Sequence, residues 1–308
     1  MKLTKLEKNI ENFLKNAKED GKNPLIVILG QTASGKTDLS ISLAKKFNGE
    51  IISTDSRQVY KYMDIGTAKI TNEEMQGIKH YLIDEVEPDQ SFTLADFLQK
   101  ARYAITRIQQ KNKIPFLVGG TGLYISAVIE NYKISNAKPD QKLRNKLEKE
   151  LAEFGPEYLY KKLQKLDPKA AEKIHPNNIR YVIRALEINL STNENKHDRK
   201  GKSQFAVFKI GIDWPREILY KRINKRADIQ LEKGLLKEVK GLLEKGYHEK
   251  LPSMASIGYQ EMIPFLKGEM TLEEAKEILK KNTRNYAKRQ ITWFNRYKDI
   301  NYVDYTEV

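Results

Sequence analysis

The feature that most constrains this chain is residues 25–37, LIVILGQTASGKT, where an apolar run of strand length leads into a glycine-rich loop. The loop fits G-x-x-x-x-G-K-[ST], with Gly30, Gly35, Lys36 and Thr37 at the fixed positions. Glycines at this spacing let backbone N–H groups surround a phosphate, and the Lys36 ammonium neutralises its charge. The Thr37 hydroxyl is suited to hold Mg²⁺. We therefore expect a strand, a phosphate-binding loop and a helix, with ATP or GTP as the default ligand.

Strand and helix patterns alternate after this loop. Residues 38–47 have helical spacing, 51–54 form a short apolar strand pattern, and 79–86 are a candidate third strand. A helical pattern over 91–113 is followed by strand, glycine turn and helix over 114–129. This alternation predicts an α/β fold built on a doubly wound parallel sheet.

Acidic residues lie after one of these predicted strands and within another. Asp55 comes directly after residues 51–54, and Asp84 lies within the segment 79–86. In an open α/β sheet the ligand crevice lies at the carboxyl ends of the strands, so Asp55 should emerge beside the phosphate loop. Its carboxylate could bind a metal or act as a base, or it could only cap a helix. Asp84 is a second candidate metal ligand.

The sequence pattern changes over residues 132–204, where charged helical patterns replace the strand patterns. Residues 133–202 hold 17 Lys or Arg and 10 Asp or Glu. We expect an all-helical subdomain inserted into a core made of 24–131 and 205–308, with 1–23 forming an amphipathic helical extension. The positive excess indicates a clamp for a polyanion; the alternative is an ordinary helical subdomain with a solvated charged face.

The composition of the whole chain supports a polyanionic partner. Lys and Arg number 55 against 41 Asp and Glu, for a net charge of +14, which favours nucleic acid first and an anionic membrane surface second. Without cysteine the chain cannot form disulfides or a thiolate site, and its four histidines lack metal-ligand spacing. No apolar run is long enough to span a bilayer, so we expect a cytoplasmic protein, and we expect a monomer.

A long helical pattern over residues 216–246 carries Arg222 and Arg226 four positions apart, on one face. These arginines could bind a pyrophosphate with paired hydrogen bonds, or they could be solvated. The last helical pattern, 272–297, mixes basic and aromatic residues, which suits phosphate contact on an anchored helix.

A series of short motifs follows one another from about residue 25 to residue 296. They are GQTASGKT, STDSRQVYKYMDIGTAK, HYLID, FTLADF, LVGGTGLY, DPKAAEKIHPNN with RALE, LPSMASIGYQE and AKRQITWF. In these motifs the chain resembles the bacterial tRNA dimethylallyltransferases, also called tRNA isopentenyltransferases. The resemblance implies transfer of a dimethylallyl group from dimethylallyl diphosphate to N6 of adenosine 37, next to the tRNA anticodon, with Mg²⁺ and without ATP hydrolysis.

The resemblance also implies roles for individual residues. Asp55 would be the general base at the adenine amine, Thr37 would contact Mg²⁺ and the diphosphate, and Arg226 would stabilise the leaving diphosphate. The implied diphosphate-binding residues are Gly30, Gln31, Thr32, Ala33, Ser34, Gly35, Lys36 and Thr37. The implied tRNA contacts are Asp55, Ser56, Arg57, Gln58, Thr121, Arg144, Arg180 and Arg184.

The chain departs from the usual family pattern at three places. Gln31 stands where proline is usual, Tyr181 stands where arginine is common, and residues 1–23 extend beyond the usual bacterial start. Three rival functions remain at this point: an adenylate isopentenyltransferase acting on free AMP, a P-loop kinase of a small molecule, and an RNA-binding P-loop protein without catalysis.

Overall fold

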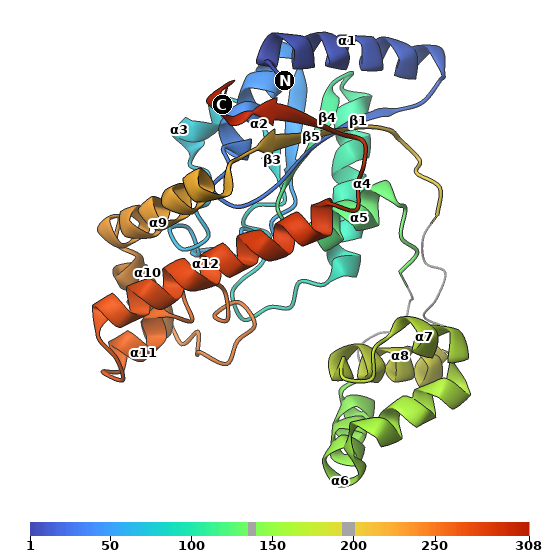
Figure 1. The fold of residues 1–308 in the computed structure, drawn as a ribbon, viewed down its shortest axis with the longest axis vertical. Coiled ribbons are helices and arrows are strands. Elements are labelled where there is room, and N and C mark those ends of the chain that lie inside the picture. Colours follow the sequence, from blue (N-terminus) through green and yellow to red (C-terminus); the bar gives the residue numbers. More distant parts are fainter. Residues whose placement is uncertain (135–139, 193–200, 308) are drawn as a thin grey trace. The chain divides into compact units, whose positions relative to one another are not determined.

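The computed structural model describes residues 1–134, 140–192 and 201–307, and the chain divides into two compact units (Figure 1). The first unit contains Met1–Ile129 and Ser203–Val308, and the second contains Glu130–Lys202. The first is built on a parallel sheet covered by helices, and the described residues of the second contain helices only. The predicted fold class, an α/β core with an inserted helical subdomain, is therefore confirmed.

The sheet of the first unit has six strands in the described chain, all parallel, in the order β3-β2-β4-β1-β5-β6. Ile28 of the central strand pairs with Val118 on one side and with Ile210 on the other. Since all strands run the same way, the loops that follow them gather at one edge. The strands are β1 (Pro24–Leu29), β2 (Gly49–Ser53), β3 (His80–Tyr81), β4 (Ile114–Gly119), β5 (Ala206–Asp213) and β6 (Ile300–Asp304).

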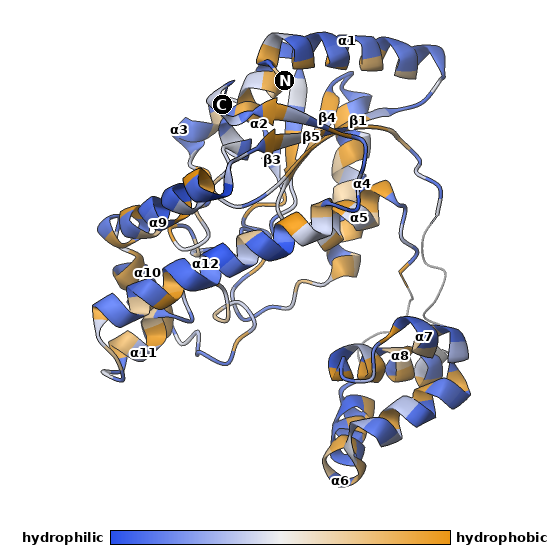
Figure 2. Ribbon diagram, in the orientation of Figure 1, coloured by the Kyte–Doolittle hydropathy of each residue, from blue (hydrophilic) through white to orange (hydrophobic). Residues whose placement is uncertain are grey.

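Helices cover both faces of this sheet. Ile26 and Ile28 of β1 belong to a buried cluster that includes residues of α1 (Leu3–Glu19) and α2 (Lys36–Lys46). Alternate residues of a strand point to opposite faces, so Leu25, Val27 and Leu29 face the other side. There α4 (Leu94–Gln110) and α5 (Gly122–Ile129) pack against the sheet. Figure 2 shows the strands as largely apolar, as burial on both faces requires.

The N-terminal extension is part of this unit. Leu6 and Ile10 of α1 are fully buried, and the Met1 ammonium donates to the carbonyl of Tyr302 in β6 at 2.8 Å. The extension therefore packs against β1, β5 and β6 on the face of the sheet that α2 also covers.

Four further helices build a second core in the first unit: α9 (Arg216–Glu232), α10 (Leu235–Glu244), α11 (Met262–Leu266) and α12 (Leu272–Phe294). The single long helix expected over residues 216–246 is wrong. Gly234 adopts a left-handed φ of 98°, which ends α9 and caps α10.

The third strand is much shorter than expected, since only His80–Tyr81 of residues 79–86 pair with β2. Leu82 and Asp84 have positive φ values of 65° and 55°, which strands do not allow. The Asp84 carboxylate forms an ion pair with Lys69 at 2.5 Å. It does not line the cavity described below, so its predicted role as a metal ligand is not supported. Two short elements complete the first unit, α3 (Asn72–Met75) and a 3₁₀ turn at Tyr305–Glu307.

The second unit consists of α6 (Gln141–Leu166), α7 (Pro168–Lys173) and α8 (Ile179–Thr192). Gly155 has φ 80° and precedes Pro156, which kinks α6. Leucines on both arms of α6 and apolar residues of α8 form the core of this unit. Among the helices that the structure describes, none is long and apolar enough to cross a membrane.

Candidate active site

The phosphate loop joins β1 to α2 at the carboxyl edge of the sheet. Gly30 has φ 145° and Gly35, which precedes the first residue of α2, has φ 86°. These conformations suit glycine and turn the loop around the start of the helix. The Lys36 ammonium bonds to the Gln31 carbonyl inside the loop and lies 3.5 Å from the Ser34 hydroxyl. A helix N-terminus with a lysine in this position is suited to bind phosphate groups.

Side chains from distant elements hold the outside of the loop. Trp214 Nε1 donates to the Ser34 carbonyl at 2.9 Å, and Arg222 Nε donates to the Ala33 carbonyl at 2.9 Å. The Arg222 guanidinium also stacks 4.5 Å from the centre of the Trp214 ring. Arg222 therefore supports the loop backbone, and it does not line the cavity described next, although it lines another cavity on the outer side of the loop together with Arg226.

Gln290 of α12 ties two loops of the site together. Its Oε1 accepts from Thr32 N at 2.8 Å in the phosphate loop, and its Nε2 donates to Gly120 O at 3.0 Å after β4. The side chain is buried, and a Cβ on Gly120 would lie 2.1 Å from Gln290 Nε2. The loops that follow β1 and β4 are therefore held at a defined separation.

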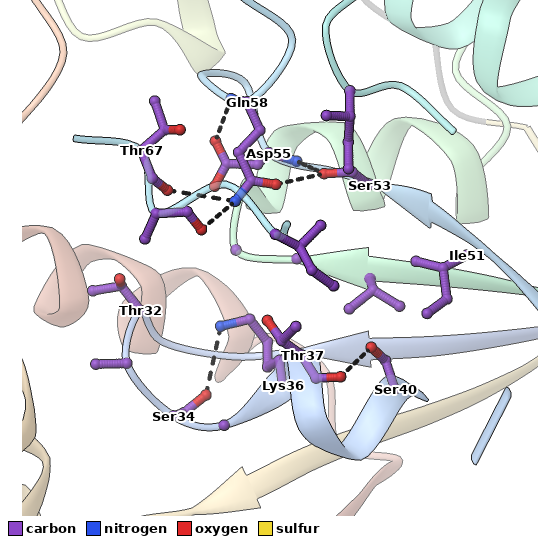
Figure 3. Close-up of a pocket in the computed structure, with 18 of the residues that line it drawn as sticks. Thr32, Ser34, Lys36, Thr37, Ser40, Ile51, Ser53, Asp55, Gln58 and Thr67 are labelled. Atoms are coloured by element: carbon purple, nitrogen blue, oxygen red, sulfur yellow. Dashed lines mark hydrogen bonds between the residues drawn. The ribbon is translucent and has the colours of Figure 1, made fainter. Parts of the chain in front are cut away.

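A cavity of about 130 Å³ lies between the phosphate loop and the loop that follows β2. Figure 3 shows Thr32, Ser34, Lys36 and Thr37 on one side of it, across from Asp55, Gln58 and Thr67. Of the predicted site residues, those lining this cavity are Thr32, Ala33, Ser34, Gly35, Lys36, Thr37, Asp55, Gln58 and Arg226. Gly30 and Gln31 belong to the loop but do not line the cavity.

The Asp55 carboxylate is oriented by its own loop. Oδ1 accepts from the backbone N–H of Arg57 at 2.8 Å and of Gln58 at 3.4 Å, which is a local turn of the Asx type. In the part of the chain that the structure describes, no donor bonds the other oxygen, Oδ2. The carboxylate thus keeps one oxygen with the capacity to accept a proton or a hydrogen bond from a bound molecule.

Burial and neighbouring charges lower the pKa values of the two cations at the first cavity. Burial, together with the nearby Arg226 guanidinium, lowers the pKa of Lys36 from 10.5 to about 7, and the Asp55 carboxylate opposes this shift. Burial likewise lowers the pKa of Arg226, and Asp55 opposes that shift. A doubly charged anion in this cavity would relieve the repulsion between the two cations.

A second cavity, of about 300 Å³, adjoins the first. The two share Thr32, Asp55, Thr67, Arg226 and Tyr286 in their walls. A third cavity, of about 560 Å³, adjoins the outer side of the phosphate loop. Asp55 and Arg226 thus stand where a molecule in the first cavity would meet one in the second.

The remaining residues predicted in this loop region lie at the second cavity. Ser56 and Arg57 line it, and Arg57 Nη1 donates to the Pro252 carbonyl at 2.8 Å. Thr121 does not line either cavity, but its Oγ1 accepts from Ser56 N at 3.2 Å. Thr121 therefore supports the loop that carries Asp55 without lining either cavity.

The three arginines predicted in the insertion belong to the second unit. Arg144 and Arg184 both bond to Glu187, whose side chain is 0% exposed, at 2.9 Å and 2.6 Å. Arg180 is exposed on α8. Tyr181 is 58% exposed beside it. The structure brings Arg144 and Arg184 together around one buried carboxylate.

Tyr286 is a site residue that the sequence did not reveal. It lines both the first and the second cavity, and burial raises its pKa to about 12, with Asp55 adding to the shift and hydrogen bonds to Thr121 and Gln290 opposing it. Tyr286 and Gln290 are four residues apart and lie on one face of α12. The motif AKRQITWF contained Gln290, so helical spacing from that residue was the available signal.

The donors at the cavity fit a magnesium ion held mainly by substrate. Within residues 1–134, 140–192 and 201–307, no group of three or more His, Cys, Asp or Glu side chains could hold a metal. The Thr37 hydroxyl and the Asp55 carboxylate line the same cavity. Mg²⁺ is commonly bound through one or two protein oxygens together with substrate phosphates and water, so these donors suffice.

Comparisons with known proteins point to one family. The model of the family described as IPP transferase matches residues 58–297. The tRNA dimethylallyltransferase of Acetivibrio thermocellus is 51% identical over 288 residues, covering 92% of each chain. The crystal structure of a tRNA isopentenylpyrophosphate transferase from Bacillus halodurans has a TM-score of 0.70 at 48% identity, covering 92% of this chain and 90% of that one. A eukaryotic dimethylallyltransferase acting on tRNA has a TM-score of 0.80 at 34% identity, covering 92% of this chain and 74% of that one.

Proposed function

Since the chain belongs to the IPP transferase family, we propose that it transfers a dimethylallyl group from dimethylallyl diphosphate to N6 of adenosine 37 in tRNA. The products are diphosphate and N6-(dimethylallyl)adenosine. The observation that carries the proposal is the first cavity. There the phosphate-binding loop faces the Asp55 carboxylate, whose Oδ2 has no hydrogen bond from the described residues.

The donor diphosphate belongs at the phosphate loop. Backbone N–H groups at the start of α2, the Lys36 ammonium and the Arg226 guanidinium would hold its oxygens. As the bond between the allylic carbon and the diphosphate oxygen breaks, negative charge grows on the leaving group, and fixed cations stabilise it there. Thr37 would hold Mg²⁺, which adds positive charge at the same oxygens when bound.

The acceptor adenine belongs on the side of the second cavity. It must leave the base stack to reach the reacting carbon, and this cavity opens next to Asp55. The new bond forms between N6 and the allylic carbon while the carbon–oxygen bond to diphosphate breaks. The N6 proton passes to Asp55 Oδ2, which makes the weakly nucleophilic amine reactive.

The second unit supplies the grip on tRNA in this proposal. Its basic excess and the exposed Arg180 suit contact with phosphates. The buried Glu187 holds the guanidinium groups of both Arg144 and Arg184 in fixed positions. Substrate tRNA would therefore engage both units, whereas free AMP would have no use for the second.

A transfer assay with radiolabelled dimethylallyl diphosphate and Mg²⁺ tests the proposal, with unmodified tRNA and AMP offered in separate reactions. We expect label in tRNA only. Label in AMP would favour the adenylate enzyme, and phosphate transfer from ATP with no prenyl transfer would favour a kinase.

The variant Asp55→Asn tests the role of the carboxylate in the same assay. We expect transfer to slow by a factor on the order of 10² to 10⁴, with tRNA binding retained. Asp20→Asn is a matched control, because that carboxylate is exposed and, within the part of the chain that the structure describes, pairs with Lys22 alone, at 3.3 Å. Wild-type turnover in Asp55→Asn would refute the assignment of Asp55 as base.

A further inference from the structure

The segment Asp64–Ala68 forms a wall of all three cavities, and the proposed reaction gives it no role. Thr67 lines the first and second cavities, and Ala68 lines the first and third. Gly66 lines the second, and Ile65 lines the third. This segment is the end of the motif STDSRQVYKYMDIGTAK. Its position therefore affects the walls of all three of these cavities.

One carboxylate from a distant helix organises the backbone of this segment. Glu238 of α10 accepts hydrogen bonds from three consecutive N–H groups. Oε2 lies 3.0 Å from Asp64 N and 2.8 Å from Ile65 N, and Oε1 lies 3.0 Å from Gly66 N. Three successive backbone N–H groups that converge in this way form an anion-binding concavity, and here the protein's own carboxylate occupies it.

Tyr259 donates a fourth hydrogen bond to the Glu238 carboxylate. Its hydroxyl donates to Glu238 Oε1 at 2.5 Å, and its side chain is fully buried. Burial and the neighbouring carboxylate hold the pKa of Tyr259 well above its ordinary value, so the hydroxyl remains a donor. A Cβ on Gly66 would lie 2.3 Å from the Tyr259 ring, which leaves space for glycine alone. The contact joins the motif LPSMASIGYQE to the segment Asp64–Ala68.

The carbonyls of the segment are held from two sides. Gln230 Nε2 donates to Ile65 O at 2.7 Å and to Gly66 O at 3.0 Å. From the active-site side, Gln58 Nε2 lies 3.4 Å from Thr67 O and 3.2 Å from Ala68 O. The segment therefore bridges α9 and α10 to the loop that carries the base.

Gln58 connects this segment to Asp55. Its Oε1 accepts from the Ser53 hydroxyl at 3.3 Å, and Ser53 Oγ in turn accepts from Asp55 N at 3.3 Å (Figure 3). The Gln58 backbone N–H also bonds to Asp55 Oδ1. A displacement of Thr67 and Ala68 would release the Gln58 amide and, through it, the support of Asp55.

We infer that Glu238 is a positioning residue for prenyl transfer: it fixes the segment Asp64–Ala68, which holds Gln58 and thereby the loop of the base Asp55. The inference rests on the proposed function, because the effect is expressed through Asp55. It reassigns the Gln58 side chain, which the sequence predicted as a tRNA contact, to the support of the catalytic loop.

The variant Glu238→Gln keeps the size of the side chain but places an amide N–H₂ group against backbone donors. Transfer is measured over a range of tRNA and dimethylallyl diphosphate concentrations, below the melting temperature of each variant, which gives the rate at saturation and both KM values. We expect the rate to fall about 10²-fold, the loss typical of a misplaced catalytic group, while KM for tRNA and for dimethylallyl diphosphate changes little. Glu244→Gln on the same helix is the control, because Glu244 is exposed and its one ion pair among the described residues is with Lys240, at 3.8 Å.

The double variant Glu238→Gln with Gln58→Ala separates positioning from general stability. If Glu238 acts through Gln58, the double variant should be no slower than the slower single variant. Losses that multiply, a loss confined to KM, or a wild-type rate in Glu238→Gln would each overturn the inference. If Glu238→Gln does not fold, Tyr259→Phe removes one bond to the same carboxylate, and the same outcomes apply. Absence of transfer by the wild-type chain would instead refute the proposed function.

Discussion

The charge state of Lys36 predicts a pH dependence of diphosphate binding with a defined sign. Burial and the neighbouring Arg226 lower its pKa to about 7, so in the free protein the side chain loses its charge as the pH rises through 7. A bound diphosphate favours the ammonium form, so binding at higher pH takes up a proton. The affinity should therefore fall as the pH rises above 7.

The magnitude follows from the fraction of Lys36 that is protonated before binding. With a pKa of about 7, that fraction is about one half at pH 7 and about one hundredth at pH 9. If only the ammonium form binds, the apparent Kd should rise roughly 50-fold over this range. A pKa at the ordinary value of 10.5 would leave the affinity nearly unchanged over the same two units.

Calorimetric titration with inorganic pyrophosphate at pH 7, 8 and 9 measures both quantities. Two buffers with different ionisation enthalpies report the protons taken up, which should rise from about half toward one per site. Lys36→Met has no charge to lose, so its weaker binding should show only the titration of pyrophosphate itself. The same pH slope in the wild type and in Lys36→Met, or no proton uptake by the wild type, would refute the reasoning.

Three further perturbations follow from the geometry. Gly66→Ala should push the segment Asp64–Ala68 away from the Tyr259 ring and slow transfer about 10²-fold, whereas Gly241→Ala, with open space around it, should have the wild-type rate in the same assay. Gln290→Ala leaves two backbone groups without a partner, which should cost about 1–3 kcal/mol of unfolding free energy; an unchanged thermal midpoint would contradict this. The affinity for tRNA should fall steeply as the salt concentration rises, because phosphate contacts dominate binding. Filter binding at two salt concentrations measures this, and equal affinities would contradict the proposal that the basic second unit binds tRNA phosphates.

Much of the candidate site was predictable because its chemistry is local in the chain. The pattern from Gly30 to Thr37 dictates a loop around a helix N-terminus, and the apolar strand before Asp55 places that carboxylate at the same edge of a parallel sheet. The comparisons confirm the family that the motifs indicated. The roles of the individual site residues stay predictions.

Local signals were weaker where backbone conformation depended on neighbours. Residues 79–86 are apolar enough for a strand, but Leu82 and Asp84 turn away after two paired residues, and Asp84 pairs with Lys69. The helix expected over 216–246 contains a stop signal, Gly234. This glycine adopts a left-handed conformation, which ends one helix before the next begins.

By itself, the sequence determined the phosphate loop, the alternation of strands and helices, the basic helical insertion and the place of Asp55 after its strand. Only the tertiary structure decided that Gln290 joins two loops, that Tyr286 lines two cavities, and that Glu238 organises the wall formed by Asp64–Ala68. Short-range spacing determines which residues share a loop or a helix face. A buried polar side chain that is distant in sequence from the site acts on the backbone groups that packing places beside it and that need a hydrogen-bond partner.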